Sequence, residues 1–167
     1  MPEKQEVTMM HVNLWVAAYS GFIGAIILTV LIYLLKLFGQ QVDIPYLIGT
    51  YVVDIQNKKK VYTVGIILHL LIGALWGIIY VSLMKGLAIT TNWPAGILWG
   101  FAHGVFMGSM MGIMAESHPY IGKDKPISDP GIMGREWGTL VPYWILGLHV
   151  IFGATTLLIY HHFVNLY

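Results

Sequence analysis

The chain has 167 residues, enough for one domain, of which 57% are hydrophobic and only 10% charged, far below the roughly 25% charged residues of a typical soluble domain. A formal net charge of +1 argues against a nucleic-acid partner. The absence of cysteine excludes disulfides, thiolate metal sites and lipid anchors on cysteine.

Charged residues are missing from four long stretches of the chain, residues 7–35, 61–84, 86–115 and 137–167. Each stretch is longer than the roughly 20 residues that cross a bilayer as a helix. The runs are continuously apolar rather than alternating, which argues against a membrane β-barrel. The sequence therefore predicts an all-α integral membrane protein with four transmembrane helices, at about 12–37, 61–84, 93–115 and 139–163.

Two segments between these helices have patterns of their own. Residues 44–53 are apolar but too short to cross, so we expect them to lie at the interface or to dip back into the membrane. The loop 116–138 is rich in turn-forming residues and is expected to be an ordered cap of irregular backbone.

The mixed charge of the first residues is unlike a cleaved signal peptide, so the first helix is expected to be retained.

Lysine and arginine are distributed unevenly between the two sides of this topology, which predicts its orientation. Seven of them fall on the side of the two loops at 38–60 and 116–138, and two fall on the other side. We therefore expect both loops in the cytoplasm and both termini outside, in the inner membrane of a bacterium. The seven are Lys36, Lys58, Lys59, Lys60, Lys123, Lys125 and Arg135, and the two are Lys4 and Lys85.

The second and fourth helices share a sequence pattern. Residues 69–80 and 149–160 are identical at five of twelve positions, including the histidine that begins each segment. The first and third helices share a Gly-Phe pair 79 residues apart, and the two cytoplasmic loops share a Pro-x-x-x-Gly spacing. These matches predict a single domain, 1–167, built as two repeated helical hairpins in parallel orientation (about 12–84 and 93–163), with His69 and His149 as symmetry mates.

Small residues recur at four-residue intervals along the predicted helices. Lipid supplies no hydrophobic force between helices, so their association depends on close backbone approach, which glycine permits. The pattern predicts a tightly packed four-helix bundle. The packing glycines are Gly96, Gly100, Gly104, Gly108 and Gly112 on the third helix, with Gly65, Gly73 and Gly77 on the second.

Three histidines lie deep in the predicted helices. Counted from the cytoplasmic ends, His69, His149 and His103 lie about 12, 15 and 18 Å deep, close to the middle of a bilayer. An intramembrane histidine is a functional candidate, although each could also be a neutral side chain satisfied by a nearby backbone carbonyl. His69 and His149 are each followed by Gly-Ala one turn later, as two axial ligands of haem b would require.

Methionines gather near His103 on the third helix. Met107 and Met111 are four residues apart, so their thioethers share one helix face. Thioether and imidazole ligands suit Cu(I), whereas methionine is equally an adaptable apolar filler. A copper site at Met107, Met111 and His103 is the weaker metal alternative.

The segments at 20–25, 43–49, 69–73 and 100–104 together resemble the YagU-like group of small bacterial membrane proteins of unknown function. The resemblance covers most of the chain. It implies a bacterial four-helix architecture and carries no activity with it.

Three functions remain open from the sequence. The leading hypothesis is a small accessory subunit of a larger, energy-converting membrane complex, without catalytic activity of its own, whose partners are other integral membrane subunits and lipid. The first alternative is a redox protein that binds haem b or a metal through His69 and His149. The second is a transporter or proton-conducting unit that acts as an oligomer.

Overall fold

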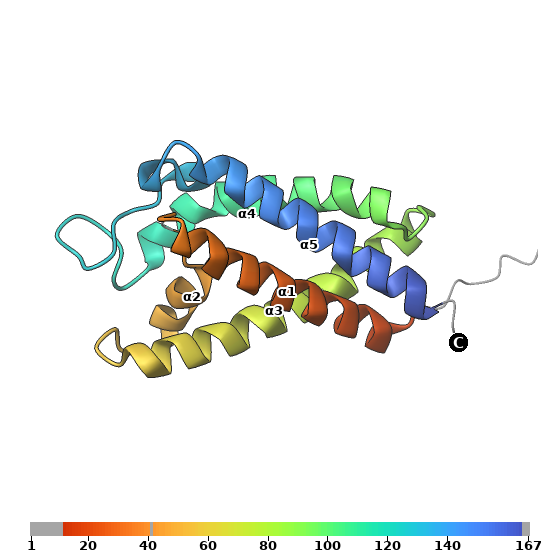
Figure 1. Ribbon diagram of the computed structural model, residues 1–167, viewed down its shortest axis with the longest axis horizontal. Coiled ribbons are helices and arrows are strands. Elements are labelled where there is room, and N and C mark those ends of the chain that lie inside the picture. The colour runs from red at the N-terminus through yellow and green to blue at the C-terminus, as the bar shows by residue number, and fades with distance from the viewer. Residues whose placement is uncertain (1–11, 41, 165–167) are drawn as a thin grey trace, which may run out of the picture.

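The computed structural model describes residues 12–40 and 42–164 and consists of helices joined by short connections and one long loop (Figure 1). The described part contains no strand. The helices are α1 (Leu14–Leu37), α2 (Ile44–Val52), α3 (Lys58–Gly86), α4 (Trp93–Ser117) and α5 (Val141–Val164), with a 3-10 helix η1 (Ile132–Trp137) before α5.

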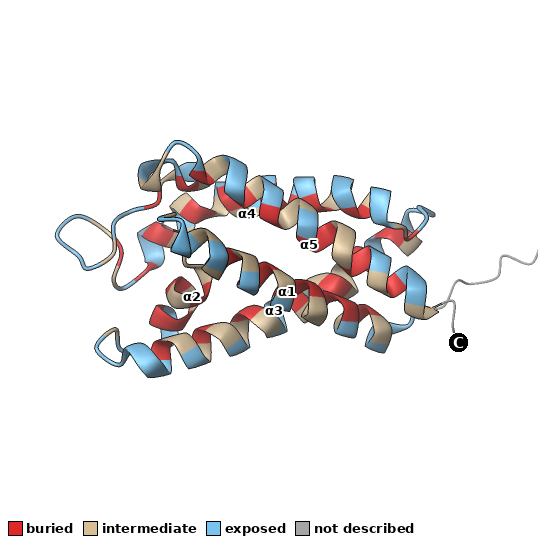
Figure 2. Cartoon of the chain, viewed as in Figure 1, coloured by how far each residue is buried: buried red, intermediate tan, exposed pale blue. Residues whose placement is uncertain are grey.

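Four of these helices, α1, α3, α4 and α5, are long and apolar enough to cross a membrane. The prediction of an all-α, four-helix membrane protein is confirmed at this level. At most 39% of the most apolar window of each helix is buried inside the protein. The bundle therefore exposes wide apolar surfaces, which suit a lipid environment. Figure 2 shows the buried residues on the sides where the helices face one another.

Asparagine side chains fix where three of these helices begin. The side chain of Asn57 accepts a hydrogen bond from the backbone N–H of Lys60, at 3.1 Å, so α3 begins at Lys58 and not at 61 as predicted. Asn13 and Asn92 cap α1 and α4 in the same way. A capped helix start satisfies N–H groups that would otherwise lack partners, so the lysines beyond the apolar run are also helical.

The four long helices are arranged in the order α3, α1, α5, α4. Helix α1 packs on both α3 and α5, and α5 packs on α4, whereas α3 and α4 do not pack along their lengths. Figure 1 shows α3 and α4 coming together at the end where α1 begins and α5 ends, here called the terminal end. They separate toward the opposite end, which carries α2 and the long loop and is here called the loop end.

Glycines make the two close crossings between the long helices. A Cβ atom on Gly21 of α1 would lie 2.8 Å from the Cα of Gly77 on α3, and one on Gly153 of α5 would lie 2.8 Å from the Cα of Gly100 on α4. The obstructing atoms are backbone, which cannot move aside as a flexible side chain can. Only glycine therefore allows these two crossings, as the small-residue pattern predicted.

The two crossings use the same contacts, but in a register that the sequence match did not predict. Gly21 faces the backbone oxygen of Gly73 in the first crossing, and Gly100 faces that of His149 in the second. His149 thus takes the place of Gly73, one turn away from the place of His69. The internal repeat stays a prediction, but these crossings do not make the two histidines equivalent.

Other glycines contact the two short helices of the loop end. Gly65 of α3 lies against the backbone of Pro45 in α2, and Gly108 and Gly112 of α4 lie against Met133 and Ile132 of η1. The five-glycine face of α4 is therefore divided, because Gly96, Gly100 and Gly104 meet α5. The apolar segment 44–53 does not cross the bundle but forms α2, packed against α3.

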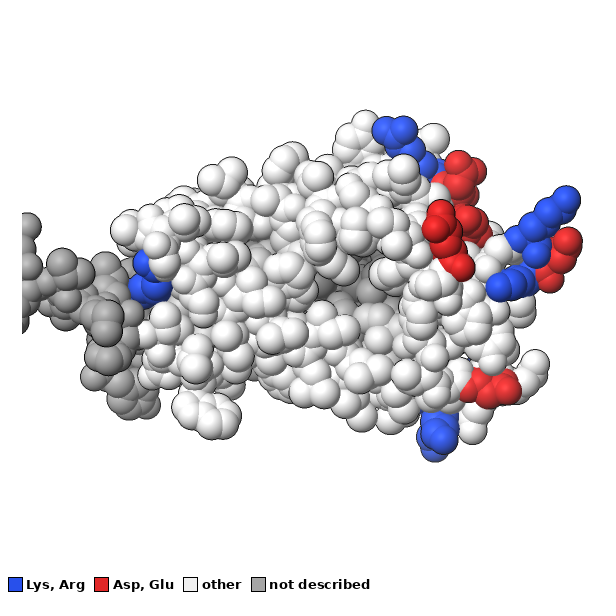
Figure 3. All heavy atoms as spheres, turned by 180° about the vertical axis from the view of Figure 1, so that it is seen from behind, with Lys and Arg blue, Asp and Glu red and all other residues white. Residues whose placement is uncertain are grey.

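Charged side chains gather at the loop end, as Figure 3 shows for one face of the molecule. Among them Asp43 caps α2 by accepting from the N–H of Tyr46, and it also pairs with Lys36 and accepts from the Tyr62 hydroxyl at 2.8 Å. This cluster ties the end of α1 to the starts of α2 and α3.

His118, just beyond α4, joins the long loop to α2. It is buried, its Nδ1 accepts from the N–H of Tyr120 at 3.1 Å, and its Nε2–H lies 3.2 Å from the backbone oxygen of Leu47. Burial lowers the pKa of His118, and the positive charge of Lys125 lowers it further, while the Leu47 carbonyl acts in the opposite direction. A proton on Nδ1 would face the N–H of Tyr120, so the contact requires neutral imidazole.

The glycine crossing gives a test of stability. We expect Gly153→Ala to destabilise the protein by about 1–3 kcal/mol, because the added methyl group meets α4 backbone that cannot yield. Gly147→Ala on the same helix is the matched control, since a Cβ there meets nothing within 4 Å. Unfolding in mixed micelles, followed by circular dichroism, measures both variants. Equal stability of the two would contradict the close crossing.

The His118 contact gives a test of pH dependence. The unfolded chain binds this proton with a pKa of about 6.5, and the folded protein has a lowered value. Stability should therefore be complete above about pH 6.5 and decrease as the pH falls below it. His118→Gln should be less stable at pH 8 but lose less stability between pH 7.5 and about pH 5 than the wild type. Parallel curves for the two proteins would show that His118 does not contribute.

Candidate functional site

A cavity of about 180 Å³ lies between the helices, on the loop-end side of the two glycine crossings. Residues of all five α-helices line it, together with residues of the long loop, and its walls are mostly apolar. Figure 3 shows a hollow on the face between α3 and α4, where these two helices have separated. The cavity is therefore open toward the region that lipid would occupy.

Aromatic side chains close the cavity toward the terminal end. The ring of Trp76 on α3 lies 3.8 Å from that of His103 and 6.3 Å from that of Phe106, both on α4. These contacts hold α3 and α4 together through side chains where their backbones no longer touch. The cavity is thus a pocket with a lateral mouth and a closed inner end.

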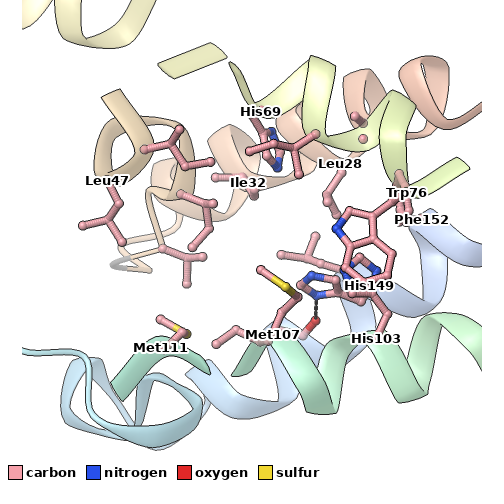
Figure 4. Close-up of a pocket in the computed structure, with 18 of the residues that line it drawn as sticks. Leu28, Ile32, Leu47, His69, Trp76, His103, Met107, Met111, His149 and Phe152 are labelled. Carbon is pink, nitrogen blue, oxygen red and sulfur yellow. Dashed lines mark hydrogen bonds between the residues drawn. The ribbon is translucent and has the colours of Figure 1, made fainter. Parts of the chain in front are cut away.

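The three predicted histidines all line this cavity, which has few other polar groups (Figure 4). His69 points inward from α3, while His103 and His149 lie on the opposite wall formed by α4 and α5. The rings of His103 and His149 are 4.8 Å apart, edge to face. The structure therefore places the ring of His149 beside that of His103, while His69, its predicted symmetry mate, lies on the opposite wall.

Hydrogen bonds at Nδ1 determine which nitrogen of His69 is protonated. Its Nδ1 lies 2.9 Å from the hydroxyl oxygen of Thr29, and that hydroxyl lies 2.7 Å from the backbone oxygen of Ala25. Because the carbonyl can only accept, the Thr29 hydroxyl donates to it and accepts from His69 Nδ1–H. The Nε2 atom of His69 is then an unprotonated acceptor.

His149 has the same protonation, fixed by a hydrogen bond within its own helix. Its Nδ1 lies 2.7 Å from the backbone oxygen of Ile145, one turn earlier on the same helix. A carbonyl accepts only, so Nδ1 carries the proton and Nε2 is an acceptor. A hydrogen bond from the other ring nitrogen to a backbone carbonyl is how metal-binding histidines are oriented.

His103 has the opposite arrangement. Its Nδ1 lies 2.9 Å from the Tyr80 hydroxyl, whose other available acceptor, the backbone oxygen of Trp99, is 3.5 Å away. The shorter contact assigns the tyrosine proton to His103 Nδ1, so Nε2 carries a hydrogen and is a donor. This Nε2 atom is buried and has no partner among the described residues.

The sequence analysis missed the residues that orient these rings. Thr29 is a hydroxyl in the middle of the first apolar run, and Tyr80 is the last residue of the matched segment, so both were visible as polar groups. Their partners were not visible, because Thr29 and Tyr80 lie 40 and 23 residues from the histidines they bind. Trp76, which packs on His103, carried no separate signal.

The dimensions of the cavity bear on the predicted haem. A cavity of about 150 Å³ holds benzene, so 180 Å³ suits a group of one or two rings. A porphyrin is several times larger and does not fit without separation of the helices. Bis-histidine ligation also requires two nitrogens about 4 Å apart across the iron, whereas His69 and His149 lie on opposite walls (Figure 4).

The residues of the copper alternative also line the cavity, since Met107, Met111 and His103 all face it, together with Met114. Within residues 12–40 and 42–164, no three His, Asp or Glu side chains form a group that could hold a metal ion. A copper site would therefore have to combine imidazole with thioether ligands, and it stays a hypothesis.

Comparison of the chain with protein-family models, with curated proteins and with solved structures gave no match. The functional argument consequently depends on the site itself.

Proposed function

We propose that this multi-pass membrane protein binds a small lipophilic ring compound that carries a polar group and enters the cavity from the bilayer between α3 and α4. The observation that carries the proposal is the apolar, laterally open cavity whose walls present three imidazole Nε2 atoms. Helix packing alone does not require such a cavity. A ligand of one or two rings has the size that the cavity admits.

The state of the histidines supports a ligand with hydrogen-bonding groups. Each Nδ1 has a hydrogen bond to another described residue, and the Nε2 of His103 is buried without such a partner. A buried polar atom without a partner costs about 1–3 kcal/mol, and the bilayer core supplies no water to replace that partner. A bound polar group would recover this free energy.

The sequence hypothesis of an accessory subunit of an energy-converting complex is a second proposal, compatible with the first. It is supported by the wide apolar surfaces of the bundle, on which Trp15, Leu98 and Tyr143 are more than two-thirds exposed. Other subunits could cover these surfaces as well as lipid does. Native electrophoresis of the protein from its own membrane tests this proposal.

For orientation we propose that the loop end is cytoplasmic and the membrane is the inner membrane of a bacterium. The support is the excess of lysine and arginine in the two loops of that end.

The cavity proposal predicts that filling the cavity abolishes binding. Met107→Trp places a larger ring into the cavity from α4, and we expect it to weaken the binding of a naphthol to the protein in lipid nanodiscs by about tenfold or more. Isothermal titration calorimetry measures the affinity, with empty nanodiscs to subtract partitioning into lipid.

Met110→Trp is the matched control for this experiment. Met110 lies on the same helix, does not line the cavity and is similarly half-buried. It should retain the wild-type affinity. Failure of the wild type to bind, or equal weakening by both substitutions, would reject the cavity as the binding site.

The orientation proposal predicts the labelling of single cysteines, a clean experiment because the chain has none of its own. In right-side-out vesicles, a membrane-impermeant maleimide should label Thr90→Cys in the α3–α4 connection. Lys59→Cys at the loop end should be labelled only after permeabilisation. Both positions are exposed, and the reverse result would invert the topology.

A further inference from the structure

The wall formed by α4 and α5 presents a donor beside an acceptor. His103 Nε2–H is a donor, and His149 Nε2 is an acceptor, as their Nδ1 partners determine. The two rings are 4.8 Å apart, and the Nε2 of His103 has no partner among the described residues. A single polar group of a ligand placed between them would therefore meet both.

A hydroxyl group matches this pair and a carbonyl does not. A hydroxyl can donate to His149 and accept from His103, whereas a carbonyl oxygen can accept from His103 but leaves the lone pair of His149 unpaired. His149 cannot adapt by moving its proton to Nε2, because Nδ1 would then face the Ile145 carbonyl without a hydrogen. The site therefore discriminates between the two groups through His149.

His69 supplies a second acceptor on the opposite wall, across the cavity (Figure 4). A flat ring that carries hydroxyls at its two ends would direct one to His69 and the other to the His103–His149 pair. The apolar residues between the walls, among them Leu28, Trp76 and Phe152, suit the ring itself.

The geometry points to a hydroquinone as the ligand class, bound in preference to the corresponding quinone. This inference rests on the proposed function, since it names the substrate class of the same cavity. The reduced form has two hydroxyls for the three imidazoles, while the oxidised form has two carbonyls and leaves the acceptor nitrogen of His149 unpaired. His69 can adapt to a carbonyl, because the Thr29 hydroxyl can turn to donate to Nδ1 and the histidine proton can then lie on Nε2. His149 cannot adapt in this way, because its Nδ1 faces a carbonyl.

The test compares three compounds of similar shape under argon: trimethylhydroquinone, trimethylbenzoquinone and the dimethyl ether of trimethylhydroquinone. Calorimetry with the full chain in nanodiscs measures each affinity. We expect the hydroquinone to bind at least about tenfold more tightly than either of the others. This comparison uses the wild-type protein and does not depend on the folding of a variant.

His149→Gln then assigns the preference to His149. The glutamine amide can donate as well as accept, so the advantage of the hydroquinone over the quinone should fall to about threefold or less. His162→Gln makes the same change on the same helix at the terminal end, far from the cavity lining, and should leave the advantage unchanged.

The outcomes separate this inference from the proposed function. Equal binding of all three compounds, weakened by Met107→Trp, would overturn the hydroquinone preference and leave the cavity as a binding site. Binding of none of them and of no naphthol would overturn the proposed function itself. Tighter binding of the quinone, or an unchanged preference in His149→Gln, would reject the assigned proton positions.

Discussion

The backbone contact at the two glycine crossings is the constraint on which the rest of the structure depends. Gly21 lies against Gly77 and Gly100 against Gly153 so closely that no side chain larger than hydrogen fits between them. In a bilayer, van der Waals contact of this kind replaces the hydrophobic effect as the source of helix association. Two rigid pairs result, α1 with α3 and α4 with α5, joined through α1 and α5.

The cavity follows from the way these pairs meet. Helices that cross closely at one point diverge on either side of it, and α3 and α4 contact each other through side chains, among them Trp76, Tyr80, His103 and Phe106. Toward the loop end, α2 and η1 pack onto the pairs through further glycines instead of filling the space between them. The space between the pairs at the loop end therefore remains as a cavity that is lined by side chains and open to one side.

The Nε2 atoms of the three histidines determine which polar groups the cavity can bind. Two of the histidines donate from Nδ1, His69 to a threonine hydroxyl and His149 to a backbone carbonyl, so their Nε2 atoms present lone pairs. The third, His103, accepts the tyrosine proton at Nδ1 and presents an N–H at Nε2. The histidines are thus both satisfied structural side chains and available ligand groups. The two readings of a deep histidine that the sequence left open describe different nitrogens of the same ring.

The sequence by itself determined the four apolar helices, the use of glycine in their packing and the positions of the three histidines along them, because charge exclusion and four-residue spacing are local properties. It also placed the methionines beside His103 on one helix face. Only the tertiary structure decided that His149 pairs with His103 and that His69 stands on the opposite wall, because ring partners depend on the rotation of each helix about its axis. A one-turn difference between the two glycine crossings, invisible in a match of five residues in twelve, gives His149 the place of Gly73 and not that of His69. The cavity likewise depends on tertiary packing, because residues far apart in the sequence line it together.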